Sequence, residues 1–122
     1  MQTTYEQVSD HRAEISVFET GRGLVVHILT DITFENWFRI RTAVLAACEE
    51  RGKPGTVILD LGGVYHIDSS GVGALLELAQ KAACANVSFI LSSLEASPRR
   101  VLDITGLGEL FQISDELSRF CH

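Results

Sequence analysis

The residues with the clearest chemical potential lie together in residues 66–73, which read His-Ile-Asp-Ser-Ser-Gly-Val-Gly. A serine beside a histidine and an aspartate is the constellation of nucleophilic catalysis, in which the histidine must reach the serine hydroxyl. In an extended segment His66 could approach Asp68, because alternate residues share a face. Sequence neighbours rarely form such a triad, so an exposed loop histidine is the simpler interpretation.

Known nucleophile and phosphate-binding motifs are incomplete in this segment. A nucleophile elbow needs glycine two places before and two places after its serine, and Ser69 has Ile67 before it. Gly71 and Gly73 start a dinucleotide-binding fingerprint, but Leu76 stands where its third glycine belongs. The sequence therefore gives little support to an enzyme.

The segment also has the composition of a helix start. Asp68 and the two serines after it are preferred N-caps, so a capped helix is the simplest interpretation. Two adjacent hydroxyls exceed what one cap needs, and Gly71 and Gly73 leave the first turn bare for a partner. A phosphate at a helix N-terminus meets the positive end of the dipole and free N–H groups. A serine here can therefore be phosphorylated within an intact fold, and the added charge of about −1.5 to −2 would alter a docked surface.

Strand and helix patterns alternate around this segment. The patterns predict strands over residues 14–19, 24–29, 56–61, 87–91 and 111–114, and helices over residues 34–50, 71–85 and 97–106. A hairpin turn joins the first two strands, and a terminal helical turn is expected over residues 115–120. This order predicts an α/β fold with helices packed on one mixed, mostly parallel β-sheet.

The apolar spacing predicts which faces point inward. The run over residues 56–61 indicates a strand buried on both faces, and His27 is expected to be a satisfied strand histidine or an exposed one. Ser97 and Pro98 are expected to open the third helix as its cap and first residue. The inward stripe of the first helix is Trp37, Ile40, Val44, Leu45 and Cys48, and that of the second is Val72, Leu75, Leu76, Ala79 and Ala83.

Length and charge limit the classes of function. The chain has 122 residues and a formal net charge of −6, which predicts one acidic domain over residues 1–122. No basic cluster is present to bind nucleic acid or an anionic membrane surface. The longest uncharged stretch, residues 82–94, is too short and polar to span a bilayer, and a cytoplasmic location is expected. Cys48, Cys84 and Cys121 form no metal motif, and the first two are expected to be buried thiols.

The strand, loop and helix around Ser69 together resemble the signature of a known family. Residues 57–76 read Val-Ile-Leu-Asp-Leu-Gly-Gly-Val-Tyr-His-Ile-Asp-Ser-Ser-Gly-Val-Gly-Ala-Leu-Leu and are similar to the signature of STAS domains. These are the anti-sigma factor antagonists and the related domains of sulphate transporters. Residues 101–107 and 111–113 resemble the third helix and closing strand of that family. The resemblance covers about residues 14–120.

The resemblance implies a single STAS-like domain that acts as a partner switch. Such an antagonist binds an anti-sigma factor that is itself a serine kinase, which releases the sigma factor. The kinase phosphorylates the first serine of the motif, which corresponds to Ser69, and a PP2C-type phosphatase reverses the step. The domain is then a substrate without catalytic residues or cofactors. Asp68 would sit beside the acceptor and Ser70 would support the helix start.

The resemblance also implies a binding surface for the partner. Its expected residues are Asp31, Thr33, Asp68, Ser69, Ser70, Gly71, Val72 and Gly73. Asp31 stands where many members have glycine, and Phe34 stands where they have aspartate. Trp37 and Phe38 follow this loop and would enlarge an apolar contact, although the position of Trp37 on the helix stripe favours the core.

Two other functions remain open from the sequence. One is a non-phosphorylated scaffold or accessory subunit, either of a signalling assembly or of a lipid or anion transporter. The other is a small enzyme that uses Ser69 with His66 and Asp68. Labelling of Ser69 by a serine-reactive phosphonate would favour the enzyme, and stable co-purification with a transporter would favour the accessory subunit.

Overall fold

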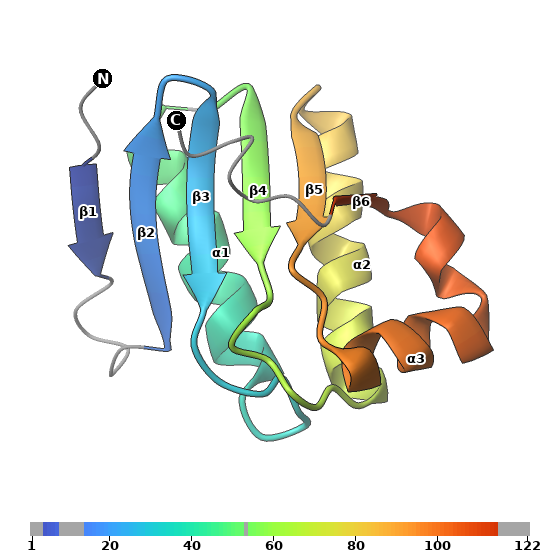
Figure 1. Ribbon diagram of the computed structural model, residues 1–122. Helices are drawn as coiled ribbons and strands as arrows, with labels where there is room; N and C mark the ends of the chain where they lie inside the picture. Colours follow the sequence, from blue (N-terminus) through green and yellow to red (C-terminus); the bar gives the residue numbers. More distant parts are fainter. Residues whose placement is uncertain (1–3, 8–13, 53, 115–122) are drawn as a thin grey trace.

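A six-stranded sheet forms the centre of the molecule (Figure 1). The computed structural model describes residues 4–7, 14–52 and 54–114, and of residues 4–7 only the backbone. The strands lie side by side in chain order: β1 (Thr4–Gln7), β2 (Ile15–Thr20), β3 (Gly23–Ile28), β4 (Thr56–Asp60), β5 (Ser88–Ser92) and β6 (Gln112–Ser114). β1, β2 and β3 pair antiparallel, and β3 to β6 pair parallel. The predicted mixed, mostly parallel sheet is confirmed, but the sequence analysis missed β1, because four residues give too short an alternation to recognise.

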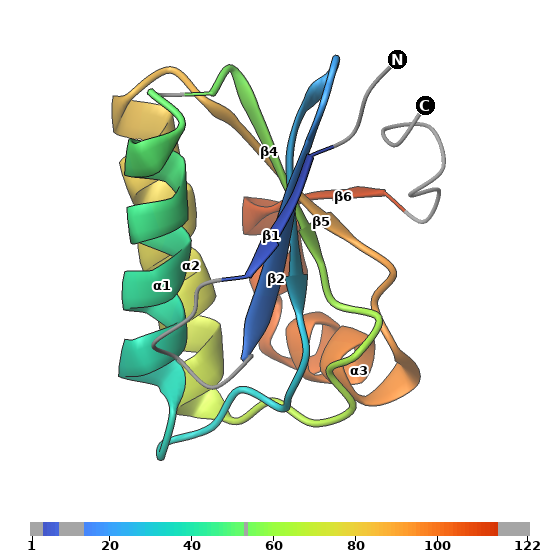
Figure 2. The same cartoon turned by 90° about the vertical axis from the view of Figure 1, so that its left-hand side faces the viewer.

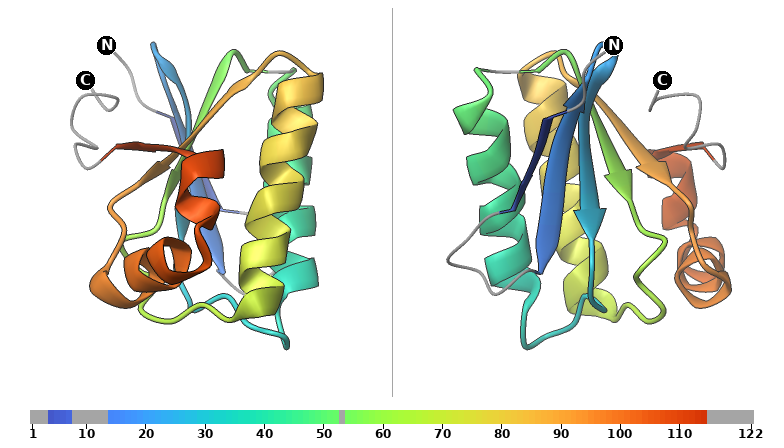
Figure 3. Two further views of the ribbon diagram at one scale, coloured as in Figure 1. Left: turned by 90° about the vertical axis from the view of Figure 1, so that its right-hand side faces the viewer. Right: turned by 60° about the vertical axis from the view of Figure 1, so that its left-hand side comes forward.

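Two long helices cover one face of this sheet. α1 (Trp37–Glu50) and α2 (Ser69–Cys84) lie next to each other on that face, and α3 (Ala96–Thr105) lies apart from them (Figures 2 and 3). A short 3-10 turn, η2 (Leu107–Leu110), follows α3. The main core fills the space between the sheet and the helices, with β3, β4 and α2 contributing many of its side chains.

β4 is the most completely buried strand. Val57 and Leu59 point into the main core, whereas Ile58 packs on the opposite face with Val25 and Ile90. All of β4 after Thr56 is buried. The prediction of a strand covered on both faces is therefore confirmed. The continuous apolar run is what such a strand requires, because neither of its faces meets water.

His27 has a partner within the sheet. It lies opposite Asp60 in the parallel ladder, and its Nδ1 is 2.5 Å from the Asp60 Oδ2. The imidazole also stacks on Phe18, with ring centroids 5.1 Å apart. Although burial opposes the charge, the hydrogen bonds from His27 and from the Gly62 N–H lower the pKa of Asp60. The expectation of a satisfied strand histidine is confirmed.

The helix boundaries differ from the predicted ones at the amino ends. α1 begins at Trp37 and not at Phe34, because residues 33–36 form a separate turn. α2 begins at Ser69, two residues before the predicted start, because the Asp68 side chain caps it. α3 begins at Ala96 after Glu95, so Ser97 lies within the helix and is not its cap. Local propensity marks such a terminus only to within a few residues.

The residues buried on α1 and α2 also differ in part from the predicted inward stripes. Ala74 and Leu78 of α2 are buried in place of Ala83, which is exposed, and Leu76 and Ala79 are half-buried. In α1 the smaller Ala43 and Ala47 are buried, whereas Trp37, Leu45 and Cys48 pack on the edge of the core. The prediction of a buried Cys84 was wrong, because Cys84 lies nine residues after the buried Leu75, on the opposite face of α2, and is exposed. The predicted turn over residues 115–120 lies outside the described residues.

Gly71 is the tightest point between α2 and the rest of the domain. A Cβ atom at this position would lie 2.5 Å from the Ile32 carbonyl oxygen and 2.5 Å from the Ile67 Cγ1. Gly73, one half-turn further on, is exposed and has open space around the same position. The bare surface that the sequence predicted for a partner is therefore present at Gly73, whereas at Gly71 the chain itself fills it.

Gly71→Ala and Gly73→Ala make a matched pair of variants. Gly71→Ala is expected to lower the free energy of unfolding by about 1–3 kcal/mol, because the new methyl group overpacks against backbone that cannot move aside. Gly73→Ala is expected to raise it by up to about 1 kcal/mol, because alanine is the better helix former. Urea unfolding of both variants measures the difference, and equal stabilities would contradict the close approach at Gly71.

Candidate functional site

Two loops meet at the end of the sheet where β3 and β4 finish. The β3–α1 loop (residues 29–36) and the β4–α2 loop (residues 61–68) run together at this end of the molecule (Figure 2). Ile32 forms a parallel bridge with Ile67. Its N–H donates to the His66 carbonyl (3.3 Å) and its carbonyl accepts from the Asp68 N–H (3.3 Å). Because neighbouring parallel strands end at the same edge, their following loops can pair in this way.

Asp68 connects α2 to the β3–α1 loop. Its Oδ1 accepts a hydrogen bond from the Gly71 N–H (3.0 Å), which caps α2. Its Oδ2 accepts a hydrogen bond from the Phe34 N–H (2.9 Å). Although burial opposes the charge, these backbone donors lower the pKa of Asp68. The carboxylate is therefore ionised at neutral pH and bonded on both oxygens.

Asp31 makes a second connection between the same loops. Its Oδ1 accepts hydrogen bonds from the N–H groups of Tyr65 (2.8 Å) and His66 (3.0 Å). Asp31 and Asp68 thus each use a carboxylate to hold backbone of the opposite loop. Both negative charges lie at the end of the sheet that carries the start of α2, which makes this end of the domain acidic.

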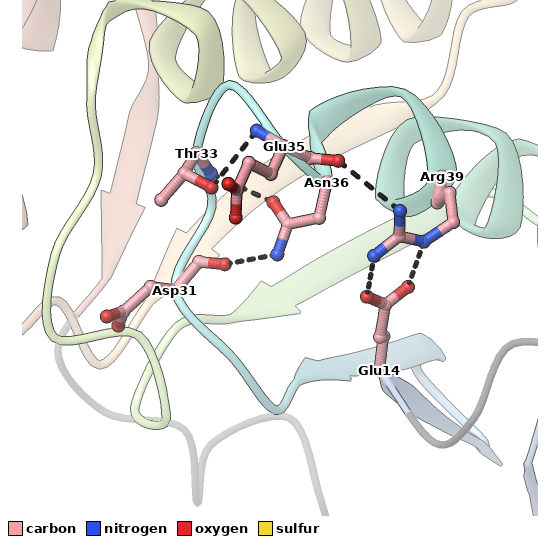
Figure 4. A network of polar contacts seen from close by, with 6 residues as sticks. All are labelled: Glu14, Asp31, Thr33, Glu35, Asn36 and Arg39. Carbon is pink, nitrogen blue, oxygen red and sulfur yellow. Dashed lines mark hydrogen bonds and ion pairs between the residues drawn. The ribbon is translucent and has the colours of Figure 1, made fainter.

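A compact turn formed by residues 33–36 completes the β3–α1 loop before α1 begins (Figure 4). The Asn36 Oδ1 accepts from the Thr33 N–H (2.9 Å), and the Asn36 Nδ2 donates to the Asp31 carbonyl (2.8 Å). The Thr33 carbonyl accepts from the Trp37 N–H (2.9 Å), which leads into α1. The sequence analysis missed Asn36, whose side chain reaches back to the Thr33 N–H as the fourth residue of a capping box does, although the box usually has Glu or Gln there.

An ion pair anchors the first turn of α1 to the sheet. The Arg39 Nη2 lies 2.7 Å from the Glu14 Oε2, and the Arg39 Nε donates to the other Glu14 oxygen (3.3 Å) (Figure 4). Glu14 immediately precedes β2, and its carbonyl accepts from the Leu29 N–H (2.9 Å). The start of α1 and the start of the β3–α1 loop are therefore held against the same residue.

The predicted site residues occupy two different environments. Ser69 and Gly73 are exposed at the start of α2, and Asp68 is exposed beside them. Ser70 is half-buried, as are Asp31 and Thr33 in the β3–α1 loop. Gly71 and Val72 are buried beneath the first turn. The structure thus brings the two predicted segments together, with the hydroxyl of Ser69 at the surface.

His66 lies in the β4–α2 loop, three residues before Ser69. His66 is exposed, and in the part of the chain that the structure describes it makes no hydrogen bond to Ser69. Among the described residues, no group of three or more His, Cys, Asp or Glu side chains gathers as a metal site. No described helix is both long enough and apolar enough to cross a membrane.

Large apolar side chains are exposed around the start of α2. Phe34 is 76% exposed in the β3–α1 loop, and Leu29, Phe38 and Tyr65 are also exposed. Phe38 lies edge-on to Trp37, with centroids 5.6 Å apart, and the Arg41 guanidinium lies 4.9 Å from the Phe38 ring centroid. Trp37 is half-buried and packs on the edge of the core, as its position on the helix stripe predicted. Leu29, Phe34, Phe38 and Tyr65 are called the apolar rim below.

The chain belongs to the STAS domain family, whose model matches residues 14–119. Its fold is similar to that of a Thermotoga maritima protein described as a candidate anti-sigma factor antagonist. That protein has 23% identity and a TM-score of 0.74, and the match covers 89% of this chain and 92% of the other. An anti-sigma factor antagonist from Mycobacterium paratuberculosis has 19% identity and a TM-score of 0.73, with 97% and 90% covered. At these identities the likeness establishes the fold.

A part of a much larger protein has the same fold. The murine anion transporter Slc26a9 matches with 27% identity and a TM-score of 0.62. The match covers 70% of this chain but only 14% of the transporter. The STAS fold therefore occurs both in small separate proteins and as a minor part of a transporter, and the likeness by itself does not choose between these settings.

The cap formed by Asp68 predicts a pH-dependent contribution to stability. Asp68→Ala is expected to lower the free energy of unfolding by about 1 kcal/mol at pH 7, as is typical for loss of an N-cap. Because the pKa of Asp68 is lower in the folded chain than its ordinary value of about 3.9, this contribution is present above about pH 4. It is lost as the pH falls through the folded pKa.

Urea unfolding at pH 7 and at pH 3 tests this expectation. The difference between the parent chain and Asp68→Ala should shrink at pH 3. Asp103→Ala removes an exposed carboxylate within α3 and serves as the control, with a small effect at both pH values. A loss for Asp68→Ala that is equal at both pH values would contradict a role of the ionised carboxylate.

Proposed function

We propose that this chain is an anti-sigma factor antagonist that works as a phosphorylation-controlled partner switch. In this proposal the start of α2 and the β3–α1 loop bind an anti-sigma factor that is a serine kinase. The kinase phosphorylates Ser69, and a PP2C-type phosphatase removes the phosphate. The observation that carries the proposal is the exposed hydroxyl of Ser69, placed as the first residue of α2 directly after its Asp68 cap.

In the phosphorylation step this chain supplies only the acceptor hydroxyl of Ser69. A bond forms between Ser69 Oγ and the γ-phosphorus of ATP while the bond from that phosphorus to ADP breaks, and the hydroxyl proton passes to a base of the kinase. The domain serves as a substrate, and we place it in the cytoplasm with the transcription machinery. A phosphate at this position lies at the positive end of the α2 dipole, which limits its effect on the stability of the fold.

The surroundings of Ser69 make the phosphate disruptive to a docked partner. The carboxylates of Asp31 and Asp68 already lie at this end of the domain, and the whole chain has a formal net charge of −6. A phosphoserine adds about −1.5 to −2 at neutral pH. A partner whose surface suits the uncharged hydroxyl would then meet concentrated negative charge, which favours dissociation.

The apolar rim supports a protein as the partner. Four large apolar side chains, Leu29, Phe34, Phe38 and Tyr65, are exposed on the loops and helix start around this end of the domain. Exposed aromatic side chains are typical anchors of protein interfaces, where a few of them carry most of the binding energy. The partner is therefore expected to present an apolar recess that accepts these side chains.

An accessory role in an anion transporter is the second candidate. The observation that favours it is the 27% identity to part of Slc26a9. Co-purification separates the two candidates, because an antagonist binds an anti-sigma kinase whereas an accessory subunit remains with transporter subunits. Ser69→Asp also separates them, because the added charge should weaken the association in the first case and leave it unchanged in the second.

Phosphorylation of Ser69 is the first direct test. The purified chain, incubated with ATP and an anti-sigma serine kinase from the same organism, is expected to gain one phosphate, located on Ser69 by tandem mass spectrometry. Ser69→Ala should gain none, because the acceptor oxygen is gone. Ser88→Ala removes an exposed serine at the start of β5 and should behave as the parent chain. A phosphate at any other residue, or none, would refute the proposal.

The apolar rim gives a second test. Phe34→Ala is expected to weaken binding of the same kinase by tenfold or more, in the range of an interface anchor, while the free energy of unfolding changes by less than about 0.5 kcal/mol. Ile104→Ala is the matched control, because Ile104 is also 76% exposed but lies on α3. Isothermal titration calorimetry measures both affinities, and an equal effect of the two variants would argue against the rim.

A further inference from the structure

Asp68 holds two separate parts of the molecule with its two carboxylate oxygens. Oδ1 accepts from the Gly71 N–H in the first turn of α2, at 3.0 Å. Oδ2 accepts from the Phe34 N–H in the β3–α1 loop, at 2.9 Å. One side chain therefore caps the helix that begins with Ser69 and also fixes the backbone of the most exposed residue in the apolar rim.

Phe34 is fixed at its backbone and exposed at its side chain. The turn around it is closed by hydrogen bonds from the N–H groups of Asn36 (3.1 Å) and Trp37 (2.9 Å) to the Thr33 carbonyl. The bond to Asp68 joins this turn to the start of α2. An exposed aromatic ring on an ordered backbone loses little conformational freedom when it binds, which favours affinity.

A separate contact holds the preceding part of the loop. The backbone of Ile32 bonds to His66 and to Asp68 through its own N–H and carbonyl groups, which involve no side-chain carboxylate. Loss of the bond between Asp68 and Phe34 would therefore release the Phe34 N–H from the start of α2 while the pairing of Ile32 with Ile67 persists. A change of the Asp68 side chain is therefore expected to break the hydrogen bond to Phe34 and to leave the backbone pairing of Ile32 intact.

We infer that Asp68 is a positioning residue that couples the phosphorylation state of Ser69 to the position of Phe34. The inference rests on the proposed function, in which Ser69 receives the phosphate. The phosphate oxygens compete for the N–H groups of the first turn of α2, including that of Gly71, because a helix N-terminus favours a dianion over a single carboxylate. Repulsion between adjacent negative charges turns the Asp68 carboxylate away, and its hydrogen bond to Phe34 is lost.

Phosphorylation then changes the docking surface in two ways. It adds charge next to α2, and it detaches from the start of α2 the backbone that carries the Phe34 ring. The second effect reaches a residue 34 positions away in the sequence through one side chain. A partner that uses the Phe34 ring as an anchor would lose a preorganised contact as well as meeting the added charge.

Amide hydrogen exchange on the isolated chain tests this coupling. Phosphoserine is placed at position 69 by chemical ligation, and exchange of individual amides is followed by NMR. The Phe34 amide is expected to exchange roughly five to ten times faster than in the unmodified chain, as for the loss of one ordinary hydrogen bond. The Ile32 amide, which bonds to the His66 carbonyl, should keep its rate. Asp68→Ala should reproduce both results without any phosphate.

The controls make each outcome decisive. Phosphoserine at position 88, at the start of β5, should leave the Phe34 rate unchanged. The coupling is overturned if Phe34 keeps its rate with phosphoserine at position 69, or if Phe34 and Ile32 accelerate equally. It is also overturned if Asp68→Ala leaves the Phe34 rate unchanged. The measurement uses neither kinase nor partner, so failure of a kinase to modify Ser69 would refute the proposed function without affecting this result.

Discussion

The close approach of Gly71 to the Ile32 carbonyl is the contact on which the site depends. It brings the first turn of α2 against the backbone of the β3–α1 loop, at a separation that leaves no room for a side chain. At that separation the Asp68 carboxylate can cap its own helix and still reach the Phe34 N–H. Ser69 lies two residues before Gly71 and is exposed, whereas Gly71 and Val72 are buried beneath the same first turn.

Backbone groups, and not side-chain partners, satisfy the two carboxylates of the site. Asp31 accepts from two N–H groups of the opposite loop, and Asp68 accepts from one in its own helix and one in the opposite loop. No basic side chain of the described residues neutralises them in these contacts. The end of the domain therefore keeps its negative charge while its backbone is ordered. On an acidic, ordered and partly apolar surface, one more negative group at Ser69 adds to charge that is already present and opposes a partner that docks through the apolar side chains.

Several features were predictable because they depend on local chemistry. The apolar run of β4, the alternation of strands and helices, and the N-capping role of Asp68 follow from residue type and spacing. The STAS family was recognisable from the segment around Ser69, and the match over residues 14–119 confirms it. One side chain was mispredicted because composition was given more weight than helix periodicity. Cys84 lies in an apolar stretch but is exposed, since it lies on the opposite face of α2 from the buried Leu75.

The sequence by itself determined the fold class, the presence of a helix start within residues 68–71 and the adjacent hydroxyls there, since these follow from local propensity and apolar spacing. Only the tertiary structure decided which surface surrounds Ser69. The hydrogen bond from the Phe34 N–H to Asp68 joins residues 34 positions apart, and no sequence pattern in either segment predicts it. Gly71 and Gly73 look equivalent in the sequence, yet the first is buried against Ile32 and the second faces solvent. The physical reason is the same in both cases: parallel strands bring the loops at their ends together, and only the packed sheet fixes the distance between those loops.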